Sequence, residues 1–200
     1  MAGDAWISET APYLAPREPG QSDAWISETA PYLAPREPGQ SDAWTGEAAR
    51  RGRRGGQRLL HAGEVETPEA VRSVLGLSVG ERVVVRRRLI LLDDRPVELV
   101  DSYYPVSVAG GTPLAEPRKV PGGAVTLLKE LGYVGADVVE DVSAGLAVEE
   151  ERVHLGLAEG SAVLRLLRLT RTADGTPMEA ALMVMPDGRH LTYRLGKRDA

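Results

Sequence analysis

The fold is decided by the stretch from Glu81 to Pro105, which has the sequence ERVVVRRRLILLDDRPVELVDSYYP. Its first half is an aliphatic and β-branched run without proline, and its second half, from Val97 to Tyr104, has alternating character. Asp93 to Pro96 lie between the two halves and are turn-forming residue types. Two strand-like runs joined by such a turn predict a β-hairpin.

A second, diverged copy of this hairpin lies between Ser161 and Pro186 and has the sequence SAVLRLLRLTRTADGTPMEAALMVMP. The copies align when one extra residue is allowed in the second turn. The aligned pairs include Gly80 with Gly160, Val83 with Val163, Arg88 with Arg168, Pro96 with Pro177, Glu98 with Glu179 and Pro105 with Pro186. Each hairpin follows an alternating stretch and a short helical stretch that is closed by Leu-Gly-Leu, where the glycine is typical of a helix end.

The two copies predict a duplicated unit of strand, helix, strand, turn and strand. Residues 106–136 separate the copies and contain a Gly- and Pro-rich loop followed by a predicted helix from Ala124 to Leu131, and a last strand is predicted from His190 to Leu195. Because hairpins dominate the connections, the expected fold class is α+β, with a mostly antiparallel sheet and helices packed on it. Two related halves imply a pseudo-twofold axis, and the cleft at this axis is the expected ligand site.

Residues 1–56 differ in kind from the rest of the chain. The segment Asp4–Ser22 is repeated letter for letter by Asp23–Ser41, and its prolines argue against a helix or a central strand. A basic, glycine-rich run, RRGRRGGQR, follows at Arg50–Arg58 and can either contact phosphate or remain a solvated linker. We interpret residues 1–56 as a flexible Pro-rich linker, with a docking motif through the repeat's Trp and Tyr side chains as the alternative.

Deleting Asp4–Ser22 should leave the melting temperature of the remaining chain unchanged within error. The deleted copy is Pro-rich, has an identical successor and carries no core pattern. Differential scanning calorimetry of the full and shortened chains checks this prediction. A drop of several degrees would show that the first copy packs on the domain.

The length, net charge and composition of the chain argue against several classes of protein. The chain of 200 residues has a formal net charge of -5, no cysteine and no apolar run long enough for a membrane span, and its N-terminus lacks signal-peptide features. Its three histidines are scattered, and no phosphate-binding loop or nucleophile motif is present. We therefore predict a cytoplasmic protein that is not an enzyme, with no catalytic residues, no metal site, no cofactor and no membrane contact.

Polar side chains inside the predicted strands are the remaining candidates for function. Arg86 and Arg88 share one face of the first hairpin strand and Arg87 takes the other. An arginine in a buried strand needs a carboxylate, an anion or solvent. Glu98 is predicted to face Arg88 across the hairpin, and their counterparts in the second copy, Glu179 and Arg168, are predicted to do the same. These pairs are either internal ion pairs or polar anchors for a small acidic ligand.

Several motifs, taken in order, resemble the UTRA domain, which is the effector-binding domain of HutC-type GntR-family transcription regulators. They are the hairpin RLILLDDRPVELVDSYYP, its strand end Ser102-Tyr103-x-Pro105, the Leu-Gly-Leu helix stop and the turn Asp174-Gly175-x-Pro177. The resemblance covers about residues 57–195. It implies a chorismate-lyase-like fold, a homodimer and a small-molecule effector whose binding alters an N-terminal winged helix-turn-helix.

The chain departs from this family upstream of the resemblance. No helix-turn-helix pattern can be placed in residues 1–56, so we expect DNA contact only through a winged helix-turn-helix that is missing from this chain. The expected organisation is a linker at 1–56 and a UTRA-like domain at 57–196. The chain is then the sensor half of a regulator, a truncated piece or a degraded gene product.

The expected pocket also departs from the family. Relatives that sense phosphorylated amino sugars carry polar residues at positions that match Arg88, Ile90, Val100, Gly123 and Val125, and only Arg88 is retained. The family's closing-strand tyrosine matches Tyr193. The predicted ligand-binding residues are Arg88, Ile90, Glu98, Val100, Ser102, Gly123, Val125, Arg168, Glu179 and Tyr193. A pocket with so few polar anchors predicts a mainly apolar effector that bears one carboxylate or a similar acceptor.

Two other functions remain open from the sequence. The fold that the resemblance implies is shared with chorismate lyase, so a small enzyme of that type is one alternative. A dimerisation module without a ligand is the other. An assay of chorismate turnover separates the first alternative from a sensor domain.

Overall fold

Six strands form one antiparallel sheet in the computed structural model, which describes residues 25–28, 35–36 and 40–192. In spatial order, the strands are β2 (Gly55–Glu66), β3 (Arg82–Leu92), β4 (Arg95–Pro105), β7 (Pro177–Pro186), β6 (Ala162–Arg171) and β5 (Asp137–Leu146). Each copy of the duplicated unit contributes three consecutive strands, and the two halves meet where β4 pairs with β7. The predicted α+β class with a mostly antiparallel sheet is therefore confirmed.

The pseudo-twofold axis passes through the middle of the sheet. Because Pro96 corresponds to Pro177 in the sequence, Asp101 corresponds to Leu182, and these two residues are paired in the ladder between β4 and β7. Neighbouring residues are exchanged symmetrically about this pair: Val100 pairs with Met183 and Ser102 with Ala181. The axis found in the structure is thus the one that the internal repeat implies.

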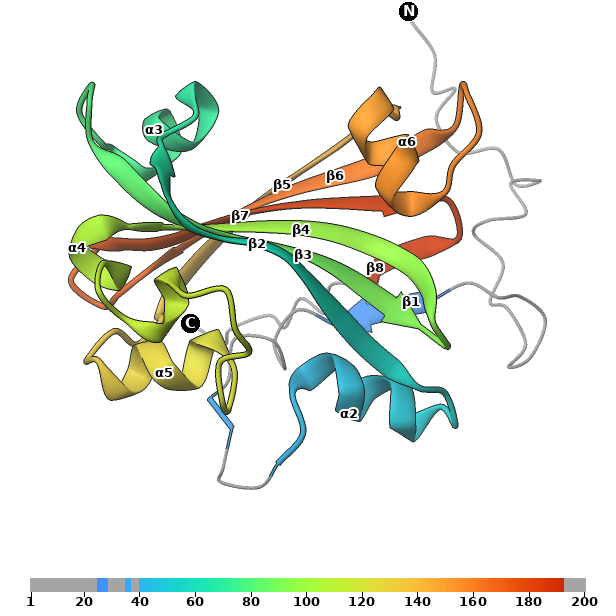
Figure 1. Cartoon of the computed structure of the whole chain (residues 1–200), viewed down its shortest axis with the longest axis horizontal. Helices are drawn as coiled ribbons and strands as arrows, with labels where there is room; N and C mark the ends of the chain where they lie inside the picture. The colour runs from blue at the N-terminus through green and yellow to red at the C-terminus, as the bar shows by residue number, and fades with distance from the viewer. Residues whose placement is uncertain (1–24, 29–34, 37–39, 193–200) are drawn as a thin grey trace, which may run out of the picture.

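Short helices cover both faces of the sheet (Figure 1). The helices of the two repeats, α3 (Glu69–Leu75) and α6 (Glu149–Leu155), lie on one face. The opposite face carries α2 (Ala43–Arg50), α4 (Val106–Ala109), η1 (Pro113–Ala115) and α5 (Ala124–Glu130). Both repeat helices end at a glycine in the left-handed conformation, Gly76 with φ 66° and Gly156 with φ 68°, as the Leu-Gly-Leu pattern predicts. No helix within the described residues is long and apolar enough to cross a membrane.

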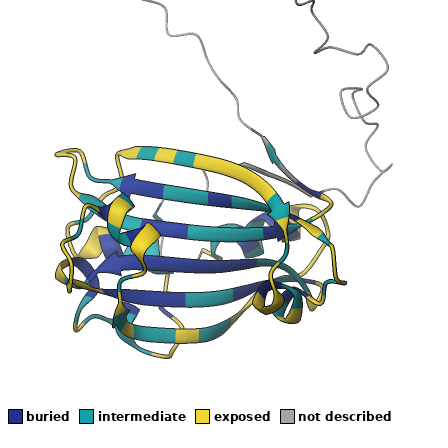
Figure 2. Ribbon diagram, turned by 90° about the horizontal axis from the view of Figure 1, so that it is seen from above, coloured by how far each residue is buried: buried dark blue, intermediate teal, exposed yellow. Residues whose placement is uncertain are grey.

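Burial follows this layered arrangement. The central strands are the most buried and the edge strand β5 is the most exposed, as Figure 2 shows. In β4, residues facing either side are buried, because helices cover both faces: Tyr103 packs against α3, and Tyr104 packs beneath α4, η1 and α5. The sheet face beneath α2 and α5 is the one that carries the polar side chains predicted to bind a ligand.

The structure differs from the predicted linker at residues 43–56. Residues 43–50 form α2, and β2 already begins at Gly55. Trp44 and Ala48, one helical turn apart, are buried against the sheet, and the Asp42 carboxylate accepts a hydrogen bond from the Thr45 amide at 2.9 Å. This apolar pair and its N-cap stabilise a short helix that follows the Pro-rich repeat and leads into the basic, glycine-rich run.

The basic run is part of the fold and not only a solvated linker. Arg53 and Arg54 form ion pairs with Asp93 and Asp94, which make the β3–β4 turn. Hydrogen bonds from the Arg54 amide and the Arg53 side chain hold the pKa of Asp93 below its usual value. These exposed ion pairs connect the residues just before β2 to the turn of the first hairpin.

The last strand also differs from the prediction. Strand β8 (Arg189–Thr192) leaves the six-stranded sheet and pairs in parallel with β1 (Trp25–Glu28), which belongs to the second copy of the N-terminal repeat. Residues 29–34 and 37–39 of that copy, and the whole first copy, lie outside the described residues. Residues 25–28 form a strand and so differ from the predicted linker. For the rest of the repeat, the linker character stays a prediction.

Candidate ligand-binding site

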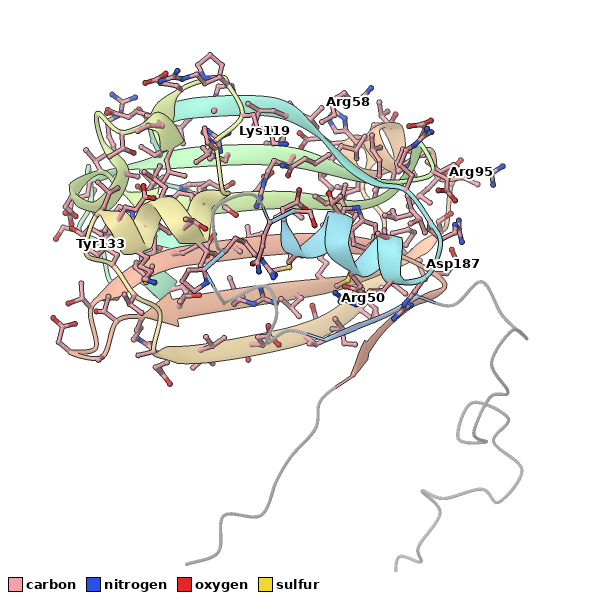
Figure 3. All side chains as sticks on the ribbon, turned by 90° about the horizontal axis from the view of Figure 1, so that it is seen from below. Arg50, Arg58, Arg95, Lys119, Tyr133 and Asp187 are labelled. Atoms are coloured by element: carbon pink, nitrogen blue, oxygen red, sulfur yellow. The ribbon has the colours of Figure 1, made fainter. Side chains whose placement is uncertain are left out.

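A cavity of about 190 Å³ lies on the pseudo-twofold axis, between the sheet and the helices α2 and α5. Figure 3 looks onto this face, with α5 lying toward Tyr133 and α2 toward Arg50. The floor consists of side chains from the four central strands: Arg88, Ile90, Glu98, Val100, Ser102, Tyr104, Arg168, Glu179, Ala181 and Met183. The cover comes from residues 42–44 at the start of α2 and from residues 122–126 at the start of α5.

The predicted binding residues gather around this cavity. All of those within the described ranges line it, including Gly123 and Val125 from the loop and helix inserted between the repeats. Tyr193 lies outside the described residues. The symmetry explains this convergence, because equivalent residues such as Arg88 and Arg168 approach the same axis from the two halves of the sheet.

The predicted ion pair between Arg88 and Glu98 is not formed. The ladder sets Arg88 opposite Val100 and Glu98 opposite Ile90, so the two charged residues are not cross-strand neighbours. Arg88 Nη2 instead donates to Ser102 Oγ at 2.8 Å, and Arg88 Nε is buried without a hydrogen-bond partner among the described residues. The first arginine of the duplicated pattern therefore keeps unused donor capacity beside the cavity.

Glu98 is paired with a residue from the end of the chain. Arg189 Nη2, from β8, lies 3.0 Å from Glu98 Oε2, and both side chains are almost completely buried. Burial raises the pKa of Glu98, while the positive charges of Arg189, Arg168 and Arg88 act in the opposite direction. The Glu98 carboxylate is thus compensated inside the fold.

In the second copy, too, the predicted ion pair is absent and each of its two residues has a different partner. Arg168 Nε contacts Glu140 Oε1 at 2.6 Å, across the β5–β6 ladder in which these residues are directly paired, and does not contact Glu179 as predicted. Glu179 Oε1 accepts a hydrogen bond of 2.7 Å from the Tyr104 hydroxyl. Burial raises the pKa of the Tyr104 phenol, and the neighbouring Glu179 charge raises it further.

The Arg86 guanidinium donates to backbone carbonyls and not to the carboxylate, anion or solvent that its place in a buried strand predicted. Only 5% of the residue is exposed, and it donates to the backbone carbonyls of Leu114 (2.8 Å), Glu116 (3.0 Å), Arg118 (2.8 Å) and Pro113 (3.3 Å). This burial lowers the pKa of Arg86. Arg86 thereby anchors the loop that leads into the cavity cover, whereas Arg87, on the other face, pairs with Asp101 at 2.6 Å.

Trp44 is the cavity residue that sequence reasoning missed most clearly. Its indole Nε1 donates to the Leu91 carbonyl at 2.8 Å, and the Arg189 guanidinium stacks over the ring at 5.3 Å from its centroid. Gly55 passes so close that a Cβ there would lie 3.0 Å from the ring. The spacing of Trp44 and Ala48 was the available signal for this helix, and the preceding Pro-rich repeat obscured it.

The groups that line the described site can bind a small molecule through hydrogen bonds and apolar contacts. Among the described residues, no group of three or more His, Cys, Asp or Glu side chains is placed to hold a metal ion. Arginine, serine, tyrosine and glutamate provide hydrogen bonds around an otherwise apolar cavity, which is the usual composition of a small-molecule site.

The chain belongs to the UTRA domain family, whose family model matches residues 50–190. Among curated proteins, it is 36% identical over 123 residues to an uncharacterized HTH-type transcriptional regulator of Streptomyces coelicolor, covering 60% of this chain and 46% of the relative. It is 34% identical over 121 residues to the HTH-type transcriptional regulator Rv0792c of Mycobacterium tuberculosis, covering 58% of this chain and 42% of that protein. The chain thus spans about half the length of the curated relatives that it matches.

Solved structures confirm the fold. The crystal structure of a protein assigned to the GntR family of transcriptional regulators superimposes with a TM-score of 0.73 at 24% identity, covering 88% of this chain and 71% of that one. The effector domain of PhnF from Mycobacterium smegmatis superimposes with a TM-score of 0.66 at 20% identity, covering 77% of this chain and 94% of that domain. The fold is therefore that of GntR-family effector domains.

Proposed function

We propose that this chain is the effector-binding domain of a HutC-type GntR-family transcription regulator. A small molecule bound in the cavity at the pseudo-twofold axis would control DNA binding by a winged helix-turn-helix outside these residues. The curated relatives are HTH-type regulators about twice as long as the matched region. This supports an effector-binding domain in the matched region and a DNA-binding domain elsewhere in the protein. A homodimer is part of the proposal, as the family resemblance implies.

One observation carries the ligand-binding part of this proposal. Arg88 Nε is buried at the cavity without a protein acceptor among the described residues, although a buried guanidinium normally uses its donors. A carboxylate or a similar acceptor on the effector would satisfy it. The apolar neighbours Ile90, Val100 and Val125 then accommodate the remainder of a mainly apolar molecule.

The N-terminal side of the cavity suggests how binding is transmitted. Asp42, Ala43 and Trp44 form part of the cavity wall, and they lie on the segment that leads upstream from β2. A ligand that contacts this wall favours one position of α2 over others, and such differential contact is what shifts a conformational equilibrium. The proposed signal therefore runs from the cavity through α2 to the chain before it.

Replacing Arg88 with alanine should weaken effector binding by about 1.5–3 kcal/mol, the range for a hydrogen bond to a charged group. A thermal-shift screen of carboxylate-bearing metabolites first identifies a ligand, and calorimetry then compares Arg88→Ala with the exposed-site control Arg58→Ala. The domain should still fold, because the Arg88 side chain makes one hydrogen bond, to Ser102, among the described residues. Normal affinity combined with a much lower melting temperature would assign Arg88 a structural role and contradict the proposed site.

A further inference from the structure

The four charged side chains that the sheet contributes to the cavity are not all compensated. Arg168 is paired with Glu140, and Glu98 with Arg189. Arg88 and Glu179, by contrast, form no ion pair with any residue that the structure describes; each makes one side-chain hydrogen bond, with Ser102 and with Tyr104 respectively. The sheet thus presents to the cavity one cation and one anion that have no ion-pair partner among the described residues.

These two charges face a common polar strip. Ser102 and Tyr104 lie on the same face of β4, two residues apart, and their hydroxyl groups contact Arg88 and Glu179 respectively. Both charges also act on the Tyr104 phenol, because Arg88 lowers its pKa and Glu179 raises it. The Tyr104 phenol therefore lies within electrostatic range of both Arg88 and Glu179. Arg88 and Glu179 form no ion pair with each other among the described residues.

A second cavity adjoins the first at Glu179. It has a volume of about 110 Å³ and is lined by Val125, Leu128, Thr170 and Met178, among others, with Glu179 lining both cavities. Thr170 is opposite Glu179 in the β6–β7 ladder and is only 4% exposed. Its hydroxyl oxygen is buried without a hydrogen-bond partner among the described residues. A buried hydroxyl without a partner costs free energy, so an added hydrogen-bonding group at this place would be stabilising.

We propose that the effector is a zwitterion, whose anionic group binds Arg88 and whose ammonium group binds Glu179 and Thr170. An ammonium carries three donors and no acceptor, so it matches a carboxylate oxygen and a hydroxyl oxygen at the junction of the two cavities. An effector with a carboxylate alone would place its charge on Arg88 and leave Glu179 and Thr170 unused. This inference rests on the proposed effector-binding function and specifies the chemical class of the effector.

The test compares compounds that differ only in charge. Calorimetry is carried out with leucine, phenylalanine and the ω-amino acids of three to six carbons, each against its N-acetyl derivative, which keeps only the negative charge. The best-binding free amino acid should bind at least tenfold more tightly than its N-acetyl form. In Glu179→Gln this preference should fall to about onefold, whereas the exposed control Glu130→Gln should retain it.

Thr170→Val provides a readout that a purely structural role would not give. Removing a buried hydroxyl without a partner should leave the melting temperature of the ligand-free domain unchanged or higher, while the free amino acid binds several-fold more weakly. N-acetyl compounds that bind as tightly as free amino acids would overturn the inference, as would carboxylates that bind through Arg88 when no amino acid binds; both results leave the proposed function standing. If no compound of either charge type binds in a wider metabolite screen, both proposals are wrong.

Discussion

Replacing Arg86 with alanine should lower the free energy of unfolding by about 3–4 kcal/mol, since four buried or partly buried carbonyls would lose a charged donor together. The guanidinium holds the carbonyls of residues 113–118 against β3, and these residues contribute Leu114 to the core. Without it, the loop between α4 and α5 loses its attachment to the sheet. Urea unfolding monitored by circular dichroism measures the change.

Two further variants separate the hydrogen-bond network from charge alone. Arg86→Lys keeps the charge but replaces the planar fork with a single ammonium, so it should recover only a minor part of the lost stability. Arg58→Ala removes an exposed arginine and should change stability by less than about 0.5 kcal/mol. A loss in Arg86→Ala no larger than that in Arg58→Ala would show that the loop does not depend on Arg86.

Replacing Trp44 with alanine should detach α2 from the sheet and remove one wall of the cavity. The substitution deletes the side chain that packs with Ile90, Leu92 and Val100, along with its hydrogen bond to Leu91, and burial of this kind contributes about 3–5 kcal/mol. Because α2 packs on one face of the sheet and forms none of its strands, the loss should be local rather than global.

Amide hydrogen exchange distinguishes a local loss of stability in α2 from a loss of stability of the whole domain. In Trp44→Ala, amides of residues 46–50 should lose their protection, while amides in β3 and β4 keep theirs. Trp44→Phe preserves most of the apolar contact but not the indole donor, so it should show an intermediate effect. Unchanged protection in α2 would contradict the anchoring role of Trp44, and loss of protection throughout the sheet would show that α2 is integral to the core.

The architecture could be predicted from the amino-acid sequence, because it depends on local and repeated patterns. The two hairpins, their Leu-Gly-Leu helix stops and the alignment of Arg88 with Arg168 predict two equivalent halves about an axis, and the pairing of Asp101 with Leu182 confirms that axis. Alternation along a strand also assigned Arg86 and Arg88 to one face and Arg87 to the other. These properties follow from residue spacing alone.

Which charged groups neutralise one another depends on contacts that form only in the folded molecule. Glu98 was expected to pair with Arg88, but its partner Arg189 lies 91 positions away, and Arg86 uses carbonyls of a loop that has no charge pattern. The burial of Trp44 likewise depends on a surface that β3 and β4 create. Ladder register and contacts between distant segments set these distances. A buried charge takes whichever partner the completed fold brings within hydrogen-bonding reach, and that information is not contained in local sequence.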